Sequence, residues 1–291
     1  MVKKMIRKAV IPAAGKGTRL RPLTLAMPKE TLPIVDKPAI HHITHSLKLA
    51  GIEDVIIVSG YKKHALMDYF SSPDSELNEG TKELDGLNFL FTTQSNSIGI
   101  ADAIGRAKSL VGNEPFVVVF GDTIITPPTY LKDMINAHTS IRIHDKNLGA
   151  TVGIMKVEDV ERWGIVKVST SNKITNCFKV LDLVEKPKKK EAPSNWAVSG
   201  CYVFEPAIFE AIRETLKRPP GAKGEYQITD SMKILIEKGF SIYAMPLEIG
   251  HYDLGTIEDY VTTFVEFALR DKSLGPIIKE RLKQKKLLKD D

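Results

Sequence analysis

The residues best suited to chemistry lie in a short loop after the first apolar run of the chain, residues 8–11. Three cations, Lys16, Arg19 and Arg21, stand there among small residues. Small side chains let the backbone come close to a ligand, and successive backbone N–H groups can form a concavity that binds an anion. This combination favours a polyphosphate, although a plain glycine-rich turn would have the same composition. The candidate contacts are Ala13, Ala14, Gly15, Lys16, Gly17, Thr18 and Arg19.

A second stretch, residues 28–38, adds a fourth cation. Lys29 lies between Pro28 and Pro33, and the prolines stiffen the segment that carries it. Neither stretch is a common phosphate loop, because the patterns G-x-x-x-x-G-K-[ST] and G-x-G-x-x-G are both absent. We therefore expect four cations to gather near one anionic ligand.

Two carboxylates stand where a hard metal ion could bind. Asp122 follows Gly121 at the end of the apolar run 115–120, and Asp253 comes shortly before Gly255. Each has an ordinary alternative role, since Asp122 could cap the next segment and Asp253 could be the N-cap of a helix. The residue types leave both roles open.

Further polar groups could contact a ligand. Gln94 and Gly99 lie in the loop after an apolar run at residues 89–92, and the amide of Gln94 offers a donor and an acceptor to the edge of a base such as uracil. Glu185 and Lys186 interrupt the end of another apolar run. An exposed glutamine and a surface turn would give the same patterns.

The seven histidines do not suggest a metal site. His41, His42 and His45 start a predicted helix, and we interpret them as facing solvent rather than binding zinc. No G-x-S-x-G elbow and no Cys–His nucleophile pattern occurs, so covalent catalysis has no candidate residue.

The elements that must position these residues alternate through the first half of the chain. Strands are predicted at residues 8–11, 55–58, 89–92 and 115–120, helices at 40–50, 62–70 and 100–111, and an exposed loop at 71–86. This alternation indicates βαβ units and a Rossmann-like, doubly wound, mostly parallel sheet. Because ligands bind beyond the carboxyl ends of such strands, the first loop, Gln94 and Asp122 should meet in one crevice.

The second half of the chain is richer in strands. Strands are predicted at 151–157, 164–168, 174–184, 198–204 and 241–245, and helices at 207–216, 228–238 and, in two stretches, 256–286. This pattern predicts a smaller mixed sheet that lies over the crevice. We expect one α/β domain over residues 1–291, with a doubly wound half at about 8–135 that binds the polyphosphate, a mixed-sheet half at about 150–255 and C-terminal helices at about 256–286.

The composition fits a folded cytoplasmic protein. Hydrophobic residues make up 43% of the chain and charged residues 26%, which are ordinary values. The net charge is +5, but Lys and Arg are spread along the chain, so no nucleic-acid-binding face is predicted. The two cysteines, Cys177 and Cys201, give no disulfide framework. Neither a membrane span nor a signal peptide is predicted.

The motifs of the chain resemble those of the sugar-1-phosphate nucleotidylyltransferases. Residues 15–22 fit G-x-G-T-R-x-x-P, residues 28–33 fit P-K-E-x-L-P, and residues 36–38 read D-K-P. The opening I-P-A-A-G and the run P-P-G-A-K-G-E-Y-Q-I-T-D at residues 219–230 are most similar to the glucose-1-phosphate uridylyltransferase branch, whereas thymidylyltransferase relatives typically have L-A-G-G and S-K-Q near the start. The resemblance covers about residues 8–275.

The resemblance implies an enzyme that transfers UMP from UTP to α-D-glucose 1-phosphate and releases pyrophosphate, with Mg²⁺ as cofactor. By the same resemblance, Asp122 and Asp253 hold the Mg²⁺, and Arg19 and Lys16 hold the leaving pyrophosphate. It implies catalytic roles for Arg19, Lys29 and Lys186, base contacts for Gln94 and Gly99, and sugar contacts for Gly164, Glu185, Lys186 and Gly200. Within the run at 219–230, Glu225 and Asp230 are expected to order the loop rather than to act in catalysis.

Two alternatives remain open at this point. Thr123 stands where thymidylyltransferases usually have Asn, but uracil and thymine differ by one methyl group, worth roughly 1–3 kcal/mol in a pocket, so a dTTP-using or dual enzyme is the first alternative. A non-catalytic sugar-nucleotide sensor is a more distant one. Since members of the family are often dimers or tetramers, we expect a homodimer or homotetramer whose interface includes the C-terminal helices.

Overall fold

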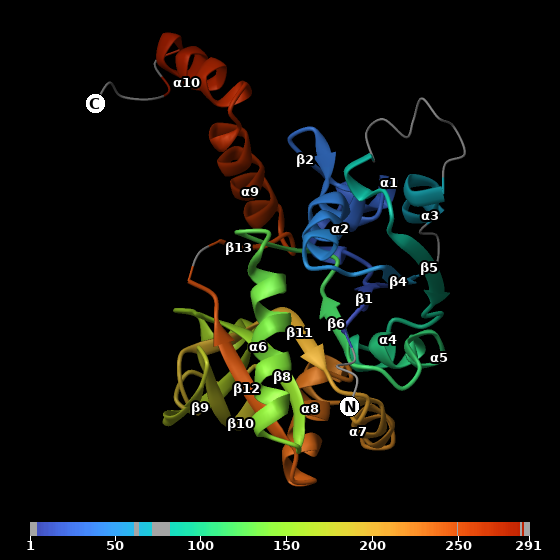
Figure 1. The fold of residues 1–291 in the computed structure, drawn as a ribbon. Coiled ribbons are helices and arrows are strands. Elements are labelled where there is room, and N and C mark those ends of the chain that lie inside the picture. Colours follow the sequence, from blue (N-terminus) through green and yellow to red (C-terminus); the bar gives the residue numbers. More distant parts are fainter. Residues whose placement is uncertain (1–4, 61–63, 72–81, 249, 286, 288–291) are drawn as a thin grey trace.

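The architecture is a sheet of nine strands with helices on both faces (Figure 1). The computed structural model describes residues 5–60, 64–71, 82–248, 250–285 and 287. Most of the loop predicted at 71–86, and the start of the helix predicted at 62–70, lie outside the described residues.

The strands largely follow the sequence prediction. They are β1 (Lys8–Ala13), β2 (Pro33–Ile34), β3 (Lys37–Pro38), β4 (Asp54–Ser59), β5 (Asn88–Thr93), β6 (Phe116–Val119), β7 (Thr123–Ile125), β8 (Leu148–Lys156), β9 (Gly164–Ile174), β10 (Cys177–Glu185), β11 (Trp196–Phe204), β12 (Ser241–Pro246) and β13 (His251–Asp253). The short strands β2, β3, β7 and β13 were not expected from the sequence, because two or three residues carry too little periodicity to predict a strand.

The helices include two that the sequence analysis missed. They are α1 (Leu23–Ala26), α2 (Ala39–Leu49), α3 (His64–Ser71), α4 (Ile100–Arg106), α5 (Lys108–Val111), α6 (Tyr130–His144), α7 (Ile208–Thr215), α8 (Ile228–Glu237), α9 (Ile257–Arg270) and α10 (Leu274–Gln284). Short 3₁₀ turns occur at η1 (Thr18–Leu20), η2 (Lys29–Thr31), η4 (Val160–Arg162) and η5 (Ala222–Gly224). The missed helices are α6 and the four-residue α1.

The strand order across the sheet is β5-β4-β1-β6-β11-β8-β12-β10-β9. The first four strands run parallel to one another, whereas β11 is antiparallel to both β6 and β8. Beyond them β12 is parallel to β8, and β10 is antiparallel to β12 and β9. The predicted α/β class is confirmed. The mixed strands, however, continue the same sheet rather than forming a second sheet over the crevice, because β11 pairs with β6 from Cys201↔Val119 to Phe204↔Phe116.

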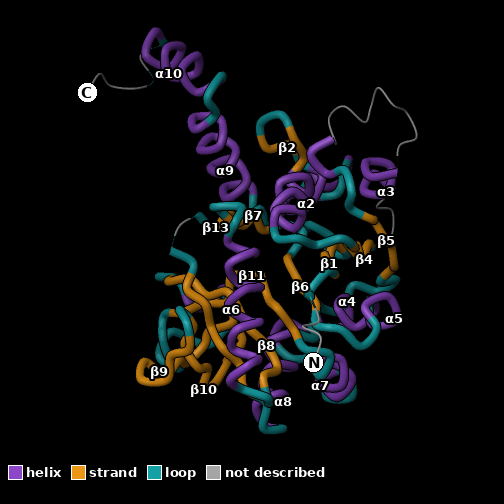
Figure 2. Tube along the Cα trace, in the orientation of Figure 1, coloured by secondary structure: helices purple, strands orange, loops and turns teal. Residues whose placement is uncertain are grey.

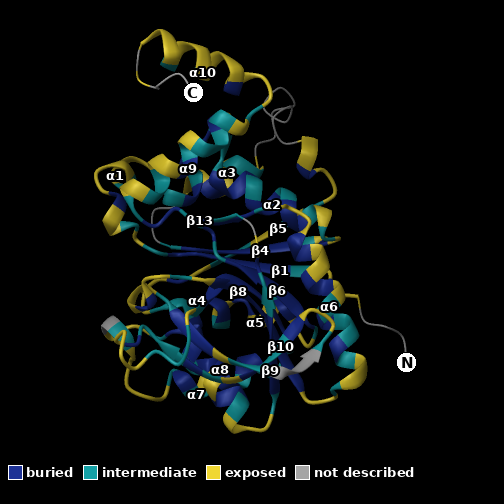
Figure 3. Cartoon of the chain, turned by 90° about the vertical axis from the view of Figure 1, so that its left-hand side faces the viewer, coloured by how far each residue is buried: buried dark blue, intermediate teal, exposed yellow. Residues whose placement is uncertain are grey.

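Two cores lie on opposite faces of the sheet, and the buried strands run between them (Figure 3). Successive side chains of a strand point to opposite faces. Thus Val10 of β1 packs with α4, α7 and α8, whereas its neighbour Ile11 packs with α2 and α6. Helices on both faces leave the loops at the carboxyl ends of the parallel strands as the place for a ligand.

Helix α6 was missed because polar residues interrupt its apolar pattern. Its buried residues are nevertheless spaced three and four apart, and they are Tyr130, Leu131, Met134, Ile135, His138 and Ile141. The Tyr130 hydroxyl donates to the carbonyl oxygen of Met245 over 2.8 Å, which ties the helix to the end of β12.

The expectation that the histidines at the start of α2 face solvent is wrong for His41. Its side chain is buried, and its ring nitrogens lie 2.7 Å from the Tyr69 hydroxyl and 3.2 Å from Glu83 Oε2. The ring therefore links α2 to α3 and to the segment that holds Glu83. In the described part of the chain no three His, Cys, Asp or Glu side chains are grouped to hold a metal ion.

Helices α9 and α10 form an arm that extends away from the sheet (Figure 2). The arm begins at Thr256, whose hydroxyl accepts a hydrogen bond of 3.1 Å from the backbone N–H of Asp259 and so caps α9. None of the described helices combines the length and the apolar character that crossing a bilayer requires.

Candidate active site

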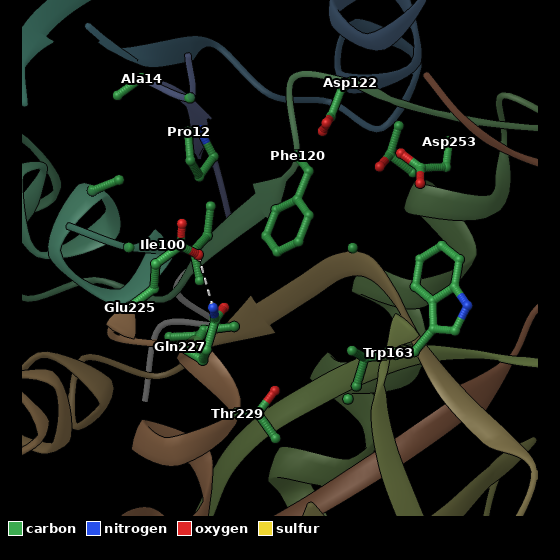
Figure 4. Close-up of a pocket in the computed structure, with 18 of the residues that line it drawn as sticks. Pro12, Ala14, Ile100, Phe120, Asp122, Trp163, Glu225, Gln227, Thr229 and Asp253 are labelled. Carbon is green, nitrogen blue, oxygen red and sulfur yellow. Dashed lines mark hydrogen bonds between the residues drawn. The ribbon is translucent and has the colours of Figure 1, made fainter. Parts of the chain in front are cut away.

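A cavity of about 550 Å³ lies where the parallel strands end and the mixed strands begin (Figure 4). Most of the predicted site residues line it, namely Ala14, Gly15, Thr18, Arg19, Lys29, Gln94, Gly99, Asp122, Gly164, Glu185, Lys186, Gly200 and Asp253. The other three do not: Ala13 is buried at the end of β1, and Lys16 and Gly17 lie in the loop beside the cavity. Segments that are distant in the sequence thus share one space of the size that small-molecule sites have.

The loop after β1 is held by its own turn. The chain leaves the sheet at Ala13 and enters the 3₁₀ turn η1, where the backbone N–H of Leu20 donates to the carbonyl of Gly17 over 3.0 Å. The Leu20 side chain is fully buried and anchors the turn. Across the loop, a Cβ added to Gly15 would lie 3.6 Å from Lys29 Nζ, so the lysine ammonium borders the loop directly.

Lys29 is ion-paired with Asp122, and its ammonium donates to Asp122 Oδ2. Both side chains are mostly buried, at 16% exposure each. Burial by itself would lower the pKa of Lys29, but the charges of Asp122, Glu30 and Asp253 outweigh it, and the pKa is raised. Lys29 is therefore a charged group enclosed by carboxylates.

Asp122 and Asp253 are brought together by the small ribbon of β7 and β13. Asp253 lies opposite Thr123 in that ribbon, and the backbone N–H of Leu254 donates to the carbonyl of Asp122 over 2.9 Å. The two carboxylates point into the same region of the cavity (Figure 4). Burial, followed by the charge of Asp122, raises the pKa of Asp253 to about 6.

This pair of carboxylates suits a hard cation that keeps other oxygen ligands. Mg²⁺ is commonly held by one or two carboxylates, with substrate phosphates and water completing an octahedron. The open cavity beside Asp122 and Asp253 leaves room for such ligands. The donor set therefore fits Mg²⁺ better than it fits a metal held by protein ligands alone.

Arg162 is a site residue that sequence reasoning missed. One of its guanidinium nitrogens, Nη2, lies 3.0 Å from Asp259 Oδ2 and 3.6 Å from Asp253 Oδ2. The carboxylate of Asp259 also accepts from the hydroxyl of the N-cap Thr256 over 2.7 Å. Arg162, which lies just before β9, thus connects that strand to the carboxylate of Asp253 on β13. The sequence could not predict that Arg162 lies at the cavity, because a lone arginine in a polar turn belongs to no recognisable pattern. Only its contacts with distant residues in the structure show this position.

On the opposite side of the cavity, Gly164 makes room for two polar side chains. A Cβ at this position would lie 2.7 Å from Thr229 Oγ1 and 2.9 Å from Glu185 Oε2. Only glycine therefore lets the carboxylate and the hydroxyl approach the same stretch of backbone. Thr229 was not predicted as a site residue, because nothing in its local sequence distinguishes it from other helix-start threonines.

Lys186 has an unusual backbone. Its φ is 45°, in the left-handed region that non-glycine residues rarely adopt. The backbone N–H of Lys186 donates to the carbonyl of Trp163 over 2.9 Å, and its ammonium lies 3.2 Å from Glu185 Oε1. These contacts hold a cation at the wall of the cavity.

Gln94 is almost fully buried and lines the cavity. Its amide nitrogen donates to the carbonyl of Gly99 over 3.0 Å and to Asp102 Oδ2 over 2.8 Å. A carbonyl and a carboxylate can only accept hydrogen bonds, so the end of the amide that faces them must be the nitrogen and not Oε1. Both amide hydrogens are engaged inside the protein, and Oε1 is the atom with which Gln94 can meet a ligand.

The loop before α4 is clamped onto the segment that holds Glu225. Gly99 has a φ of 131°, and a Cβ there would lie only 2.3 Å from the carbonyl oxygen of Tyr226. Hydrogen bonds of 2.9 and 3.0 Å join the Tyr226 backbone to Ile98 and Ala101. Glu225, which we had expected only to order its loop, also lines the cavity and accepts a 3.0 Å hydrogen bond from Gln227 Nε2 (Figure 4).

An aromatic wall completes the cavity. Phe120 and Tyr202 pack with ring centroids 5.6 Å apart, and the buried Tyr202 hydroxyl has no hydrogen-bond partner among the described residues. His251 packs edge-on against Trp163, and burial lowers its pKa to about 4. Its ring is therefore neutral at neutral pH, with Nε2 donating to the Ser199 carbonyl over 3.0 Å.

The nucleotidyl transferase family model matches residues 8–268 of this chain. The chain belongs to that family. One relative is the UTP–glucose-1-phosphate uridylyltransferase of Bacillus subtilis, which is 40% identical over 286 residues covering 93% of this chain and 94% of the relative. The enzyme of the same name from Staphylococcus epidermidis is 38% identical, covering 97% of this chain and 99% of the relative.

Solved structures of the family share the fold. A UDP-glucose pyrophosphorylase in complex with UDP-glucose superposes with a TM-score of 0.81 at 34% identity, covering 90% of this chain and 98% of the other. The UTP-bound enzyme of Acinetobacter baumannii gives a TM-score of 0.82 at 28% identity, covering 96% and 99%. The family resemblance inferred from the motifs is confirmed.

Proposed function

We propose that this protein transfers the uridylyl group of UTP to α-D-glucose 1-phosphate, forming UDP-glucose and pyrophosphate. The observation that carries the proposal is that Lys29, the paired carboxylates and Lys186 all line one cavity. The names of the full-length relatives, which are uridylyltransferases for the same sugar phosphate, support this choice of substrates.

The proposed reaction needs positioning more than proton transfer. A sugar phosphate with a second pKa of about 6 is mostly a dianion at neutral pH, so its oxygen is nucleophilic without a general base. Lys186 would hold that phosphate, and Glu185, with Gly164 beside it, would bind hydroxyls of the sugar. An oxygen of the held phosphate then attacks the α-phosphorus of UTP in line, and pyrophosphate departs.

Cations of the chain would stabilise the charge that develops on the phosphates. Arg19, Lys16 and the N–H groups of the loop after β1 would bind the leaving pyrophosphate, and Lys29 would bridge the reacting phosphates. Asp122 and Asp253 would hold Mg²⁺, which when bound supplies further charge neutralisation on the phosphate oxygens. Arg162 would keep the carboxylate of Asp253 in place through its contact of 3.6 Å.

Gln94 would recognise the base through its remaining acceptor. Its Oε1 can accept from the N3–H of uracil, whereas cytosine has an unprotonated acceptor at that position. Thymine also carries N3–H, so this contact rejects CTP but does not distinguish UTP from dTTP. Gly99 would support the base through the backbone of its loop.

The proposal is tested by measuring pyrophosphate release with Mg²⁺ and glucose 1-phosphate, with UTP, dTTP, CTP, ATP and GTP compared side by side. We expect UTP to be used best and CTP to be rejected. Equal rates with UTP and dTTP would instead favour the dual enzyme. No release with any pair would contradict the proposal for these substrates, and tight UDP-glucose binding without turnover would favour the sensor.

A further inference from the structure

The cavity contains a cation that already occupies one of the two carboxylates proposed for the metal. Lys29 donates to Asp122 Oδ2, and each of the two side chains is only 16% exposed. The other carboxylate, Asp253, has Arg162 Nη2 beside it at 3.6 Å. The carboxylates are thus balanced by cations of the chain itself.

We propose that Lys29 holds the place of the divalent cation at Asp122 in the nucleotide-free protein and must leave Asp122 before the metal can bind there, a displacement that a bound triphosphate favours. This inference rests on the metal site in the proposed function. It adds an order of binding, in which the free protein binds the divalent cation weakly and the nucleotide makes the binding tight.

Charge is the reason why the ammonium and the metal exclude each other. A Mg²⁺ ion bound to a carboxylate oxygen lies about 2 Å from it. An ammonium on the same carboxylate would then be within about 5 Å of the dication, which is well inside the Debye length of about 10 Å at 0.1 M salt. In a site that is mostly buried, solvent screens this repulsion poorly.

The nearby loop gives the displaced ammonium a destination. Lys29 Nζ would lie 3.6 Å from a Cβ on Gly15, so the ammonium borders the loop where the phosphates are proposed to bind. A change of rotamer in its flexible four-carbon chain would move the charge from Asp122 to a phosphate oxygen. The triphosphate therefore offers Lys29 a new partner and offers the metal new ligands in the same step. By linkage, nucleotide and metal must then strengthen each other's binding by the same factor.

The first test measures Mn²⁺ binding to the whole protein by the electron paramagnetic resonance signal of free Mn²⁺. In Lys29→Met, the ammonium is gone, and we expect the nucleotide-free protein to bind Mn²⁺ about tenfold more tightly than the wild type does. The matched control is Lys238→Met, which removes another lysine ion-paired with a carboxylate, Glu214, at the surface. It should leave the Mn²⁺ affinity within about twofold of the wild type, since it lies outside the cavity.

A non-hydrolysable UTP analogue completes the comparison. It should tighten Mn²⁺ binding strongly in the wild type and much less in Lys29→Met, because the variant has no ammonium to displace. An unchanged Mn²⁺ affinity in Lys29→Met would overturn the inference. Asp122→Asn separates this failure from failure of the metal site itself. If Asp122→Asn leaves Mn²⁺ binding with the analogue unaltered, the proposed metal site is wrong. If Asp122→Asn loses Mn²⁺ binding while Lys29→Met keeps the affinity of the wild type, the metal site stands and only the role of Lys29 is refuted.

A second measurement uses the wild-type protein and does not depend on the folding of Lys29→Met. In protein labelled with ¹³C at lysine Cε, the Lys29 signal is identified by its loss in Lys29→Arg. We expect this signal to move when Mg²⁺ is added without nucleotide at concentrations that occupy the site, because the ammonium must leave Asp122. A signal that stays in place while Mg²⁺ binds would mean that both cations share the carboxylate, and the inference would be wrong.

Discussion

Lys186 illustrates how strongly the site constrains a single residue. A left-handed backbone costs a non-glycine residue roughly 1–2 kcal/mol, and Lys186 adopts it with a φ of 45°. The backbone N–H bond to Trp163 and the ion pair with Glu185 hold this conformation in place. Strain of this kind persists where the surrounding structure fixes it, which is typical of functional sites.

Removing the Lys186 ammonium should affect the sugar phosphate far more than the nucleotide. For Lys186→Ala we expect kcat/KM for glucose 1-phosphate to fall about 100-fold, because one charged contact to the reacting phosphate is lost. Binding of UTP, measured by calorimetry, should stay within about threefold of the wild type. Lys188→Ala, an exposed lysine two residues further on, is the control and should keep full activity. Turnover by Lys186→Ala within about threefold of wild type would contradict the assignment.

At this scale the sequence predicted which motif residues lie at the cavity, and it was silent where a residue's position depends on contacts with distant parts of the chain. Asp122 and Asp253 were predicted because each follows or precedes a recognisable pattern, and the structure brings them together. Arg162 was missed because its role comes from a contact with Asp259, which lies 97 positions away. The buried hydroxyl of Tyr202 was missed because an apolar strand hides which of its aromatic residues borders a cavity.

At the scale of elements, the loop before α4 and the segment around Tyr226 behave as one unit. The backbone bonds from Tyr226 to Ile98 and Ala101 join them, and Gly99 lies directly on the Tyr226 peptide. Gln94 is held by the same loop through its bond to Gly99. The side of the cavity that we propose to recognise the base therefore depends on how closely these two segments approach.

Gly99→Ala should separate the two segments. A methyl group placed 2.3 Å from the carbonyl oxygen of Tyr226 must push the backbones apart. We expect a loss of about 2–3 kcal/mol in the free energy of unfolding and a higher KM for UTP. Gly239→Ala is a matched control, because Gly239 has a φ of 85° and open space where the methyl group would go. It should cost only about 1 kcal/mol and leave the KM unchanged. Equal effects of the two variants in urea unfolding would refute this account.

Helix α6 should make the stability of the protein sensitive to acid through His138. Its ring is buried between Thr151 and Glu205, and burial, the largest influence, lowers its pKa. Below pH about 6.5 the unfolded chain takes up a proton that the folded ring resists. The contribution of the neutral His138 ring to the free energy of unfolding is therefore complete above pH 6.5. It is lost as the pH falls below that value, by up to about 1.4 kcal/mol per pH unit.

Urea unfolding at pH 7.5 and 5.5 measures this dependence. The free energy of unfolding should decrease from pH 7.5 to pH 5.5. In His138→Gln this decrease should be smaller than in the wild type, because the contribution of His138 is gone. His144→Gln, at an exposed position at the end of the same helix, should retain the wild-type decrease. An unchanged decrease in His138→Gln would show that His138 is not a source of the acid sensitivity.

The elements themselves were predictable to the extent that their side chains repeat. The parallel strands carry uninterrupted apolar runs, which made β1, β4 and β6 clear from the sequence. The ribbon of β7 and β13 could not be predicted, because its pairing joins residues more than a hundred positions apart and leaves no local pattern. For α6, the three-and-four spacing of Leu131, Met134 and Ile135 was present but was masked by polar neighbours.

At the scale of the whole molecule, one continuous sheet carries both sides of the cavity. The loop proposed to bind phosphate follows β1, and the residues proposed for the sugar lie on β9 and β11 and at the end of β10, which are further along the same sheet. Pairing of β6 with β11 joins the two groups of strands rigidly. The order of strands across this junction could not be deduced from the sequence, because several pairings of β11 would bury its apolar residues equally well.

The arm of α9 and α10 should contribute to the association of copies expected from the family resemblance. Ile257, Val261 and Val265 are exposed along one face of α9, four residues apart. We expect light scattering to give two or four times the 32.3 kDa of the chain. Val261→Asp combined with Val265→Asp should lower that mass, whereas Ile143→Asp, at an exposed position on α6, should not. A monomeric wild type would contradict this expectation.

The central claim is that an oxygen of the sugar phosphate attacks the α-phosphorus of UTP inside this cavity. The most direct test supplies glucose 1-phosphate whose non-bridging phosphate oxygens are ¹⁸O, together with UTP and Mg²⁺, and weighs the products by mass spectrometry. We predict that UDP-glucose carries all of the label and that pyrophosphate carries none. Label in the pyrophosphate, or the absence of UDP-glucose at saturating substrates, would contradict the account.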